Sequence, residues 1–199
     1  MYDDEFELTF DLSDEDKASR APALEQEPVQ EAAPEPAAET EPPVESVPEP
    51  AVPAANGRCV LISGGDRGIG AAAARAFWQA GYRVAVLYHT HAEAAAALEK
   101  ELPGLLAVQC DVASRASCEV AFHTVEQAVG HVDVLVSNAG IAQQKLFTDI
   151  TPEEWQHMLD VNLSGAFHLC QLALPGMIRR KAGRILTVSS MWGQTGGSC

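Results

Sequence analysis

Ser63-Gly64-Gly65-Asp66-Arg67-Gly68-Ile69-Gly70 directly follows the apolar run Cys59–Ile62 and precedes an alanine-rich stretch. A buried strand that ends in a glycine-rich turn and then a helix presents backbone N–H groups to a pyrophosphate. Gly64 would allow the tight turn, Gly68 would let a phosphate approach the backbone, and Gly70 would let the helix pack close to the strand. The stretch is not a Walker loop, because no Gly-Lys-Ser/Thr follows. It predicts a dinucleotide site, with a plain strand-to-helix turn as the alternative.

Short runs rich in Val, Ile and Leu alternate with helical stretches from about residue 57 onward. Such runs are typical of strands buried on both faces of a parallel sheet. The expected strands are Cys59–Ile62, Val84–Tyr88, Leu105–Gln109, Val132–Val136 and Ile185–Val188. The expected helices are Ile69–Ala80, Ala92–Leu102, Arg115–Val129 and Pro152–Met177. We therefore predict an α/β fold with a Rossmann-like, doubly wound parallel sheet of five strands.

Residues 1–56 differ in composition from residues 57–199. The first segment holds sixteen acidic and two basic residues, a net charge of −14 out of −15 for the whole chain, and nine of the twelve prolines. Sequence so rich in Pro, Glu and Ala buries too little apolar surface to offset the entropy of ordering. We predict a disordered acidic tail over 1–56 and a dinucleotide-binding domain over 57–199. The alternating apolar residues of Phe6–Leu12 are an accident in this tail, or a short motif that adds a strand to a partner's sheet.

Charge and hydropathy limit the classes of function. An acidic chain disfavours nucleic acid as a partner, and no apolar run is long enough to span a bilayer. The acidic start also differs from the basic and then apolar start of a secretory signal. The cysteines, which form no CxxC pair, are Cys59, Cys110, Cys118, Cys170 and Cys199. We expect buried thiols of a cytoplasmic protein, with neither disulfides nor a metal site.

Polar residues follow the other predicted strands, at the edge where such sheets bind ligands. The second strand ends in Tyr88-His89, without an Asp or Glu for a ribose 2′-hydroxyl, while Arg67 in the glycine loop could face a 2′-phosphate. NADP(H) is therefore favoured over NAD(H), unless Arg67 and His89 are simply solvated. Asp111-Val112 offers a carboxylate to the adenine amino group, or caps the following turn. Ser137-Asn138-Ala139-Gly140 would let the backbone run beside the cofactor ribose, while Asn138 ties neighbouring strands together.

Together these motifs resemble those of the short-chain dehydrogenase/reductases, from about Gly57 to Cys199. They occur in that family's order and spacing, and they are Ser63–Gly70, Asp111-Val112, Ser137–Gly140, Val161-Asn162 and Val188-Ser189-Ser190. Ser63 and Ser137 stand where Thr and Asn are usual, and both keep a small polar side chain. Within the family, the chain looks most like the 3-oxoacyl-[acyl-carrier-protein] reductases. Two stretches, Gly140–Ile150 and Ser190–Cys199, more closely resemble the elongation factor P 5-aminopentanone reductases.

The resemblance implies an NAD(P)H-dependent oxidoreductase that reduces the ketone of a small or carrier-bound substrate to an alcohol. It implies that Ser190 hydrogen-bonds the substrate carbonyl and that Asn162 holds a water in a proton relay. The family's proton donor is a Tyr with a Lys four residues later, because a free Tyr near pKa 10 needs a nearby cation to act at neutral pH. None of Tyr2, Tyr82 and Tyr88 has such a Lys.

We therefore expect a C-terminally truncated chain that is inactive by itself, from a family whose full-length members are homo-oligomers. Loss of the later elements would leave Ile185–Val188 as an exposed edge strand and one apolar helix face uncovered, with marginal stability. The alternative is a catalytically dead nucleotide-binding or interaction module with an acidic docking tail. A Tyr-x-x-x-Lys encoded shortly beyond Cys199 would favour the enzyme, and a true stop would favour the alternative.

Overall fold

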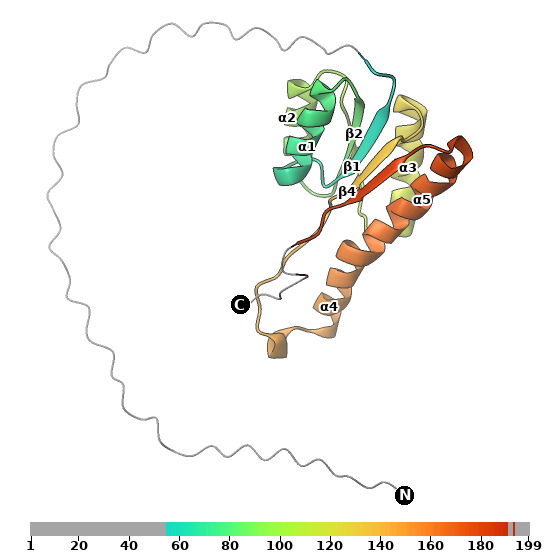
Figure 1. Ribbon diagram of the computed structural model, residues 1–199. Helices are drawn as coiled ribbons and strands as arrows, with labels where there is room; N and C mark the ends of the chain where they lie inside the picture. The colour runs from blue at the N-terminus through green and yellow to red at the C-terminus, as the bar shows by residue number, and fades with distance from the viewer. Residues whose placement is uncertain (1–54, 191–192, 194–199) are drawn as a thin grey trace, which may run out of the picture. The chain divides into compact units, whose positions relative to one another are not determined.

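The computed structural model describes residues 55–190 and Gly193, and Figure 1 shows a sheet with helices on both faces. The prediction of a disordered tail over 1–56 lies almost wholly outside these residues, as does most of Ser190–Cys199. The strands are β1 (Cys59–Ser63), β2 (Arg83–Tyr88), β3 (Leu106–Gln109), β4 (Val134–Ser137) and β5 (Arg184–Thr187). The helices are α1 (Gly68–Gln79), α2 (Ala92–Glu101), α3 (Arg115–Val129), α4 (Pro152–Leu159) and α5 (Gly165–Arg180), with a 3₁₀ turn η1 (Phe147–Asp149) and a π-helical turn η2 (Asp160–Ser164).

The five strands pair in parallel in the order β3-β2-β1-β4-β5. Val60 of the central strand pairs with Val84 of β2 on one side and Val134 of β4 on the other. The chain thus builds outward from β1 to β3 and then returns to continue from β4. In such a sheet, ligands bind outside the carboxyl ends of the strands, where the order reverses between β1 and β4. The predicted α/β fold with a doubly wound, five-stranded parallel sheet is confirmed.

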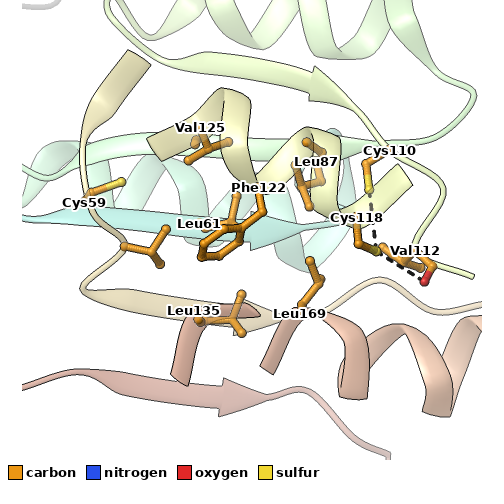
Figure 2. Packing of buried hydrophobic residues seen from close by; sticks show 14 of the residues in the cluster. Cys59, Leu61, Leu87, Cys110, Val112, Cys118, Phe122, Val125, Leu135 and Leu169 are labelled. Carbon is orange, nitrogen blue, oxygen red and sulfur yellow. Dashed lines mark hydrogen bonds between the residues drawn. The ribbon is translucent and has the colours of Figure 1, made fainter. Parts of the chain in front are cut away.

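Helices cover both faces of the sheet, so its central strands are buried on each side. All five residues of β1 are inaccessible to solvent. The cluster against α3 and α5 includes Leu61, Phe122, Leu135 and Leu169 (Figure 2). The cluster against α1 and α2 includes Val60, Ile62, Trp78 and Leu98. Each of these large side chains contributes about 1.5–3 kcal/mol through burial, so the two clusters fix the relative positions of the strand ends.

The helical stretch predicted over Pro152–Met177 is present and continues to Arg180, but a π-helical turn interrupts its regular α-helix. α4 begins at a capping box, in which Thr151 Oγ1 accepts from Glu154 N at 3.3 Å and the Glu154 carboxylate accepts from Thr151 N at 2.9 Å. The π-helical turn η2 then fits an extra residue into one turn before α5 continues. The helix ends at Arg180, after which Lys181 has a φ of 53°.

β5 lies at the edge of the sheet, as expected for the last strand. Arg184, Leu186 and Thr187 are exposed there. Along η2 and α5, large apolar side chains are also exposed at helical spacing, namely Leu163, Phe167, Leu174 and Ile178. Among the described residues, no helix is both long and apolar enough to cross a membrane.

Candidate cofactor site

The glycine loop leaves β1 through two residues in the left-handed region. Gly64 has a φ of +61° and Gly68 a φ of +53°, which favour glycine because it lacks a Cβ. A Cβ on Gly70 would overlap the carbonyl oxygen of Gly64 and lie 2.7 Å from Asn138 Nδ2. A Cβ on Gly65 would lie 2.6 Å from the Val86 side chain. The tight turn at Gly64 and the close packing at Gly70 therefore both require glycine, as expected.

Ser63 and Asn138 connect β1 to β4 at their carboxyl ends. Ser63 Oγ accepts from the backbone N–H groups of Asn138 and Ala139, each at 3.0 Å. In return, Asn138 Nδ2 donates to Ser63 O at 3.0 Å and to Gly64 O at 2.9 Å. The predicted tie between neighbouring strands is present, and it also holds the first residue of the glycine loop in place.

A cavity of about 360 Å³ lies at the carboxyl ends of β1 to β4. Its lining includes twelve of the fourteen predicted cofactor residues: Gly64, Asp66, Arg67, Gly68, Ile69, Tyr88, His89, Asp111, Val112, Asn138, Ala139 and Gly140. Gly65 and Gly70 are buried and do not line the cavity, and both pack too closely against their neighbours to carry a Cβ. The lining also contains residues that sequence reasoning missed: Leu87, Thr90, His91, Cys110, Ile141, His157 and Val161. The predicted residues are thus brought together, while their contact with a cofactor stays a prediction.

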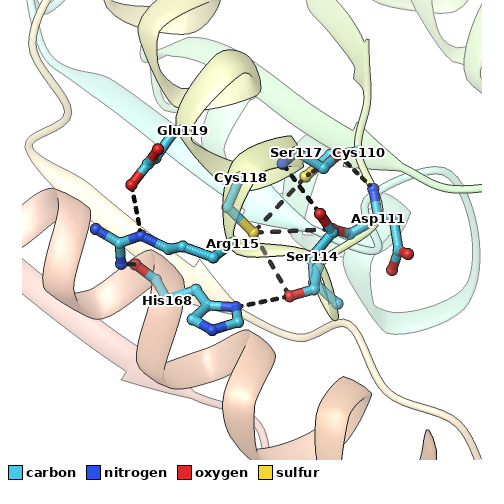
Figure 3. A network of polar contacts seen from close by, with 9 residues as sticks. Cys110, Asp111, Ser114, Arg115, Ser117, Cys118, Glu119 and His168 are labelled. Atoms are coloured by element: carbon cyan, nitrogen blue, oxygen red, sulfur yellow. Dashed lines mark hydrogen bonds and ion pairs between the residues drawn. The ribbon is translucent and has the colours of Figure 1, made fainter.

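Asp111 occupies a network of polar contacts between β3 and α3 (Figure 3). Its Oδ1 accepts from Ala113 N at 3.0 Å, and its own N–H donates to Ser117 Oγ at 3.0 Å. The turn-capping role, one of the two alternatives, is therefore present. His168 Nδ1 lies 3.1 Å from Val112 O; because a carbonyl only accepts, this nitrogen must carry the proton. These bonds fix Asp111 at the cavity wall, where the adenine role remains open to test.

Arg67 does not point freely into solvent, because its Nη1 lies 2.9 Å from His91 Nε2. A guanidinium only donates, so this ring nitrogen must be the acceptor and Nδ1 must carry the proton. His91 Nδ1 lies 3.1 Å from Thr90 Oγ1 and 3.7 Å from Asp66 Oδ2. The Asp66 side chain is only 6% exposed, and within the described part of the chain its Oδ2 has no hydrogen-bond partner. His91, which was not among the predicted site residues, is thus the residue that contacts Arg67.

The two predicted catalytic residues lie outside the cavity lining. Asn162 is in η2, where its Oδ1 accepts from Ile141 N at 2.8 Å and its Nδ2 donates to Ile141 O at 3.0 Å. These bonds attach the segment after β4 to the long helix. Ser190 follows β5 at the carboxyl edge of the sheet, and its carbonyl accepts from Gly193 N at 3.0 Å. Ser190 follows the last strand and Asn162 lies within the long helix, and the roles of both in catalysis stay predictions.

Residues 58–199 match the family model described as short chain dehydrogenase. The chain belongs to the short chain dehydrogenase family. Acetoacetyl-CoA reductase of Rhizobium meliloti is 42% identical over 139 residues, which cover 70% of this chain and 57% of the relative. Acetoacetyl-CoA reductase of Paracoccus denitrificans is 40% identical over 137 residues, or 69% and 56%. The 3-oxoacyl-[acyl-carrier-protein] reductase MabA of Mycobacterium avium is 40% identical over 144 residues, or 71% and 53%.

The chain therefore spans about half the length of the curated relatives it matches. The resemblance to short-chain dehydrogenase/reductases of the 3-oxoacyl-[acyl-carrier-protein] reductase type is confirmed. The narrower resemblance to the elongation factor P 5-aminopentanone reductases stays a prediction.

A dinucleotide fits the residues that this short chain dehydrogenase places around its cavity. A Cβ on Gly68 would meet nothing within 4 Å, so there is open space beside the first turn of α1. That turn carries no acidic residue, and the N-terminus of a helix attracts anions through its partial positive charge. Over residues 55–190 and Gly193, no group of three His, Cys, Asp or Glu side chains could hold a metal ion.

Proposed function

We propose that the chain is the cofactor-binding part of an NADP(H)-dependent reductase that converts a ketone to an alcohol. The observation that carries the proposal is the cavity at the point where the strand order reverses, bordered by the glycine loop and by Asn138. The relatives support the substrate class, since acetoacetyl-CoA reductase and 3-oxoacyl-[acyl-carrier-protein] reductase are both named for 3-oxoacyl thioesters. We therefore favour a carrier-bound 3-oxoacyl thioester, with a small aminopentanone-type ketone as the second substrate class.

Each part of the cavity has a proposed binding role. The backbone N–H groups of Gly68 and Ile69 would bind the pyrophosphate. Asp111-Val112 would bind the adenine, and Asn138–Gly140 would lie beside the ribose. Arg67 would bind a 2′-phosphate, which supports NADP(H) over NAD(H). When bound, the nicotinamide supplies the hydride.

Ser190 and Asn162 would contribute to the chemistry in different ways. Ser190 would donate a hydrogen bond to the substrate carbonyl and so orient it for hydride transfer. The Asn162 amide already bonds to both backbone polar groups of Ile141. We infer that it mainly positions the segment after β4, and that the second lone pair of Oδ1 would accept from a relay water.

We further infer that the protein acts in the cytoplasm and that full-length relatives are homo-oligomers. Four cysteines, Cys59, Cys110, Cys118 and Cys170, are free thiols, which supports a reducing compartment. The exposed apolar side chains along η2 and α5, from Leu163 to Ile178, support a protein partner at that face.

The test is calorimetric titration of the 199-residue chain with NADPH and NADH, with circular dichroism to show that the chain is folded. We expect NADPH to bind more tightly than NADH. Arg67→Gln should weaken NADPH binding by roughly 10- to 100-fold, the value of a charge-assisted hydrogen bond, and leave NADH binding nearly unchanged. Arg179→Gln, an exposed arginine in the last turn of α5, is the matched control. A folded chain that binds neither nucleotide would overturn the proposal.

Turnover should be absent from the same preparation. The chain has no Tyr with a Lys four residues later, so we expect no oxidation of NADPH at 340 nm when acetoacetyl-CoA is added. Binding without turnover would agree with a cofactor-binding part of a reductase. Measurable turnover would show that this chain has another proton donor.

A further inference from the structure

His91 connects the glycine loop to the segment after β2 through two charged neighbours. We propose that His91 is a specificity-determining residue that takes up a proton when the 2′-phosphate of NADPH binds. Binding of NADPH then depends on pH near neutrality, whereas binding of NADH does not. This inference rests on the proposed function, because it concerns how the same cavity distinguishes the two nucleotides.

The first step concerns Arg67. Without ligand, Arg67 Nη1 donates to His91 Nε2 at 2.9 Å. The ring therefore accepts a hydrogen bond that the guanidinium could otherwise donate to a ligand. A 2′-phosphate that binds Arg67 brings anionic oxygens to the position where His91 presents a lone pair. That contact is repulsive while Nε2 is unprotonated. A proton taken from the buffer onto Nε2 turns the same atom into a donor to the phosphate.

The second step concerns Asp66, which stabilises the protonated ring. Its Oδ2 is buried and lacks a hydrogen-bond partner within the described residues, and it lies 3.7 Å from His91 Nδ1. A carboxylate this poorly satisfied gains from a nearby cation. A small movement of the half-exposed His91 ring would exchange the 3.1 Å contact of Nδ1 with Thr90 Oγ1 for a hydrogen-bonded ion pair with Asp66. Asp66 on one nitrogen and the phosphate on the other would then hold an imidazolium between two anions.

Other charged and titratable groups near His91 do not take the place of Asp66 as its counter-charge. In the absence of ligand, Arg67 donates to the ring, so Nε2 is then an acceptor. Glu93 lies in the first turn of α2, next to His91 in sequence. His89 and Asp111 belong to the same cavity lining. Of these groups, Arg67 is the one within hydrogen-bond distance of the ring, so the loss of its donation is what ligand binding changes at His91.

The magnitude follows from linkage. Histidine is the side chain whose charge ordinarily changes between pH 5 and 8. Uptake of one proton per ligand makes the dissociation constant rise by at most about tenfold for each unit by which pH increases. The effect disappears at a pH low enough for His91 to be protonated in both the free and the NADPH-bound protein. The contribution of His91 to NADPH affinity should therefore be largest at the acidic end of this range and be lost as pH rises.

The experiment measures proton uptake directly, by calorimetry of the 199-residue chain in two buffers of different ionisation enthalpy, between pH 6 and 8. NADPH and 2′,5′-ADP are compared with NADH and 5′-AMP. His91→Gln keeps an acceptor for Arg67 but cannot be protonated, and Asp66→Asn removes the counter-charge. The matched control is His123→Gln, because His123 is an exposed histidine of α3 that pairs with Gln127. The phosphate's own titration is common to all variants, so the difference between wild type and His91→Gln reports His91.

We expect wild type and His123→Gln to take up a fraction of a proton per NADPH or 2′,5′-ADP that His91→Gln lacks. Asp66→Asn should reduce this uptake and weaken NADPH binding several-fold at pH 6.5, with less effect on NADH. Equal uptake in wild type and His91→Gln, with NADPH still preferred over NADH, would overturn this inference and leave the proposed function intact. Failure of the folded chain to bind either nucleotide would instead overturn the proposed function. Because the His91 side chain is about half exposed, His91→Gln should fold even if Asp66→Asn does not.

Discussion

Replacing Gly70 by alanine tests how closely α1 packs onto the end of β1. The added Cβ would overlap Gly64 O and lie 2.7 Å from Asn138 Nδ2, where contacts of 3.4 Å or more are ordinary. Relieving such overpacking costs roughly 1–3 kcal/mol. Moving Gly64 O also breaks its 2.9 Å hydrogen bond with Asn138 Nδ2, which is worth about 1 kcal/mol. Better helix propensity returns up to about 1 kcal/mol.

We therefore expect Gly70→Ala to lower the free energy of unfolding by about 1–4 kcal/mol, or Tm by roughly 2–16 °C. It should also weaken NADPH binding, because the loop moves. Urea unfolding followed by circular dichroism measures the first effect, and nucleotide titration measures the second. Gly176→Ala is the matched control, since its Cβ would meet only the flexible end of Arg180 at 3.0 Å. Wild-type unfolding and NADPH affinity in Gly70→Ala would refute the reasoning.

Three further changes test other parts of the structure. Asn138→Ala removes the donor to two carbonyls and should lower the free energy of unfolding, measured by urea titration, by about 2–3 kcal/mol. A change below about 0.5 kcal/mol would contradict a stabilising connection between β1 and β4 through Asn138. Hydrogen bonding to Lys145 lowers the pKa of the Glu154 carboxyl below its ordinary 4.5, so its stabilising contribution is complete above pH 4.5 and lost as pH falls. Glu154→Gln should flatten the acid limb of a stability–pH curve, and an unchanged limb would exclude this contribution. Burial raises the pKa of the Cys59 thiol to about 12. In native alkylation read by mass spectrometry, the half-buried Cys170 should react before Cys59, and equal rates for these two thiols would show that β1 opens.

The strands could be predicted because a buried parallel strand is apolar at every position. β1 was therefore placed within one residue. Val132 shows the limit of this reasoning, because it was the predicted start of the fourth strand. It is buried, but β4 begins only at Val134. Asp133 already bonds to Cys59 and Arg184, outside the regular ladder. Apolar residues report burial, and only backbone pairing decides where a strand begins.

The sequence did not predict η2 or the contact of His91 with Arg67. A π-helical turn changes the residue count of one turn, and the residues of Asp160–Ser164 carry no pattern that marks it. Arg67 and His91 are 24 residues apart in the chain and lie on two loops, where no periodicity sets the direction of a side chain. The connection of Asn138 to the neighbouring strand was predicted correctly, because a residue at a strand end has few other partners.

The strand order also has a consequence for synthesis of the chain. Val60 in the centre of the sheet pairs with Val134, which is made 74 residues later. At roughly 5–20 residues per second, β4 leaves the ribosome about 4–15 s after β1. During that interval one edge of the most apolar strand has no native neighbour, and such an edge pairs readily with other chains. The nascent protein is therefore most exposed to mispairing before the second half of its sheet has been translated.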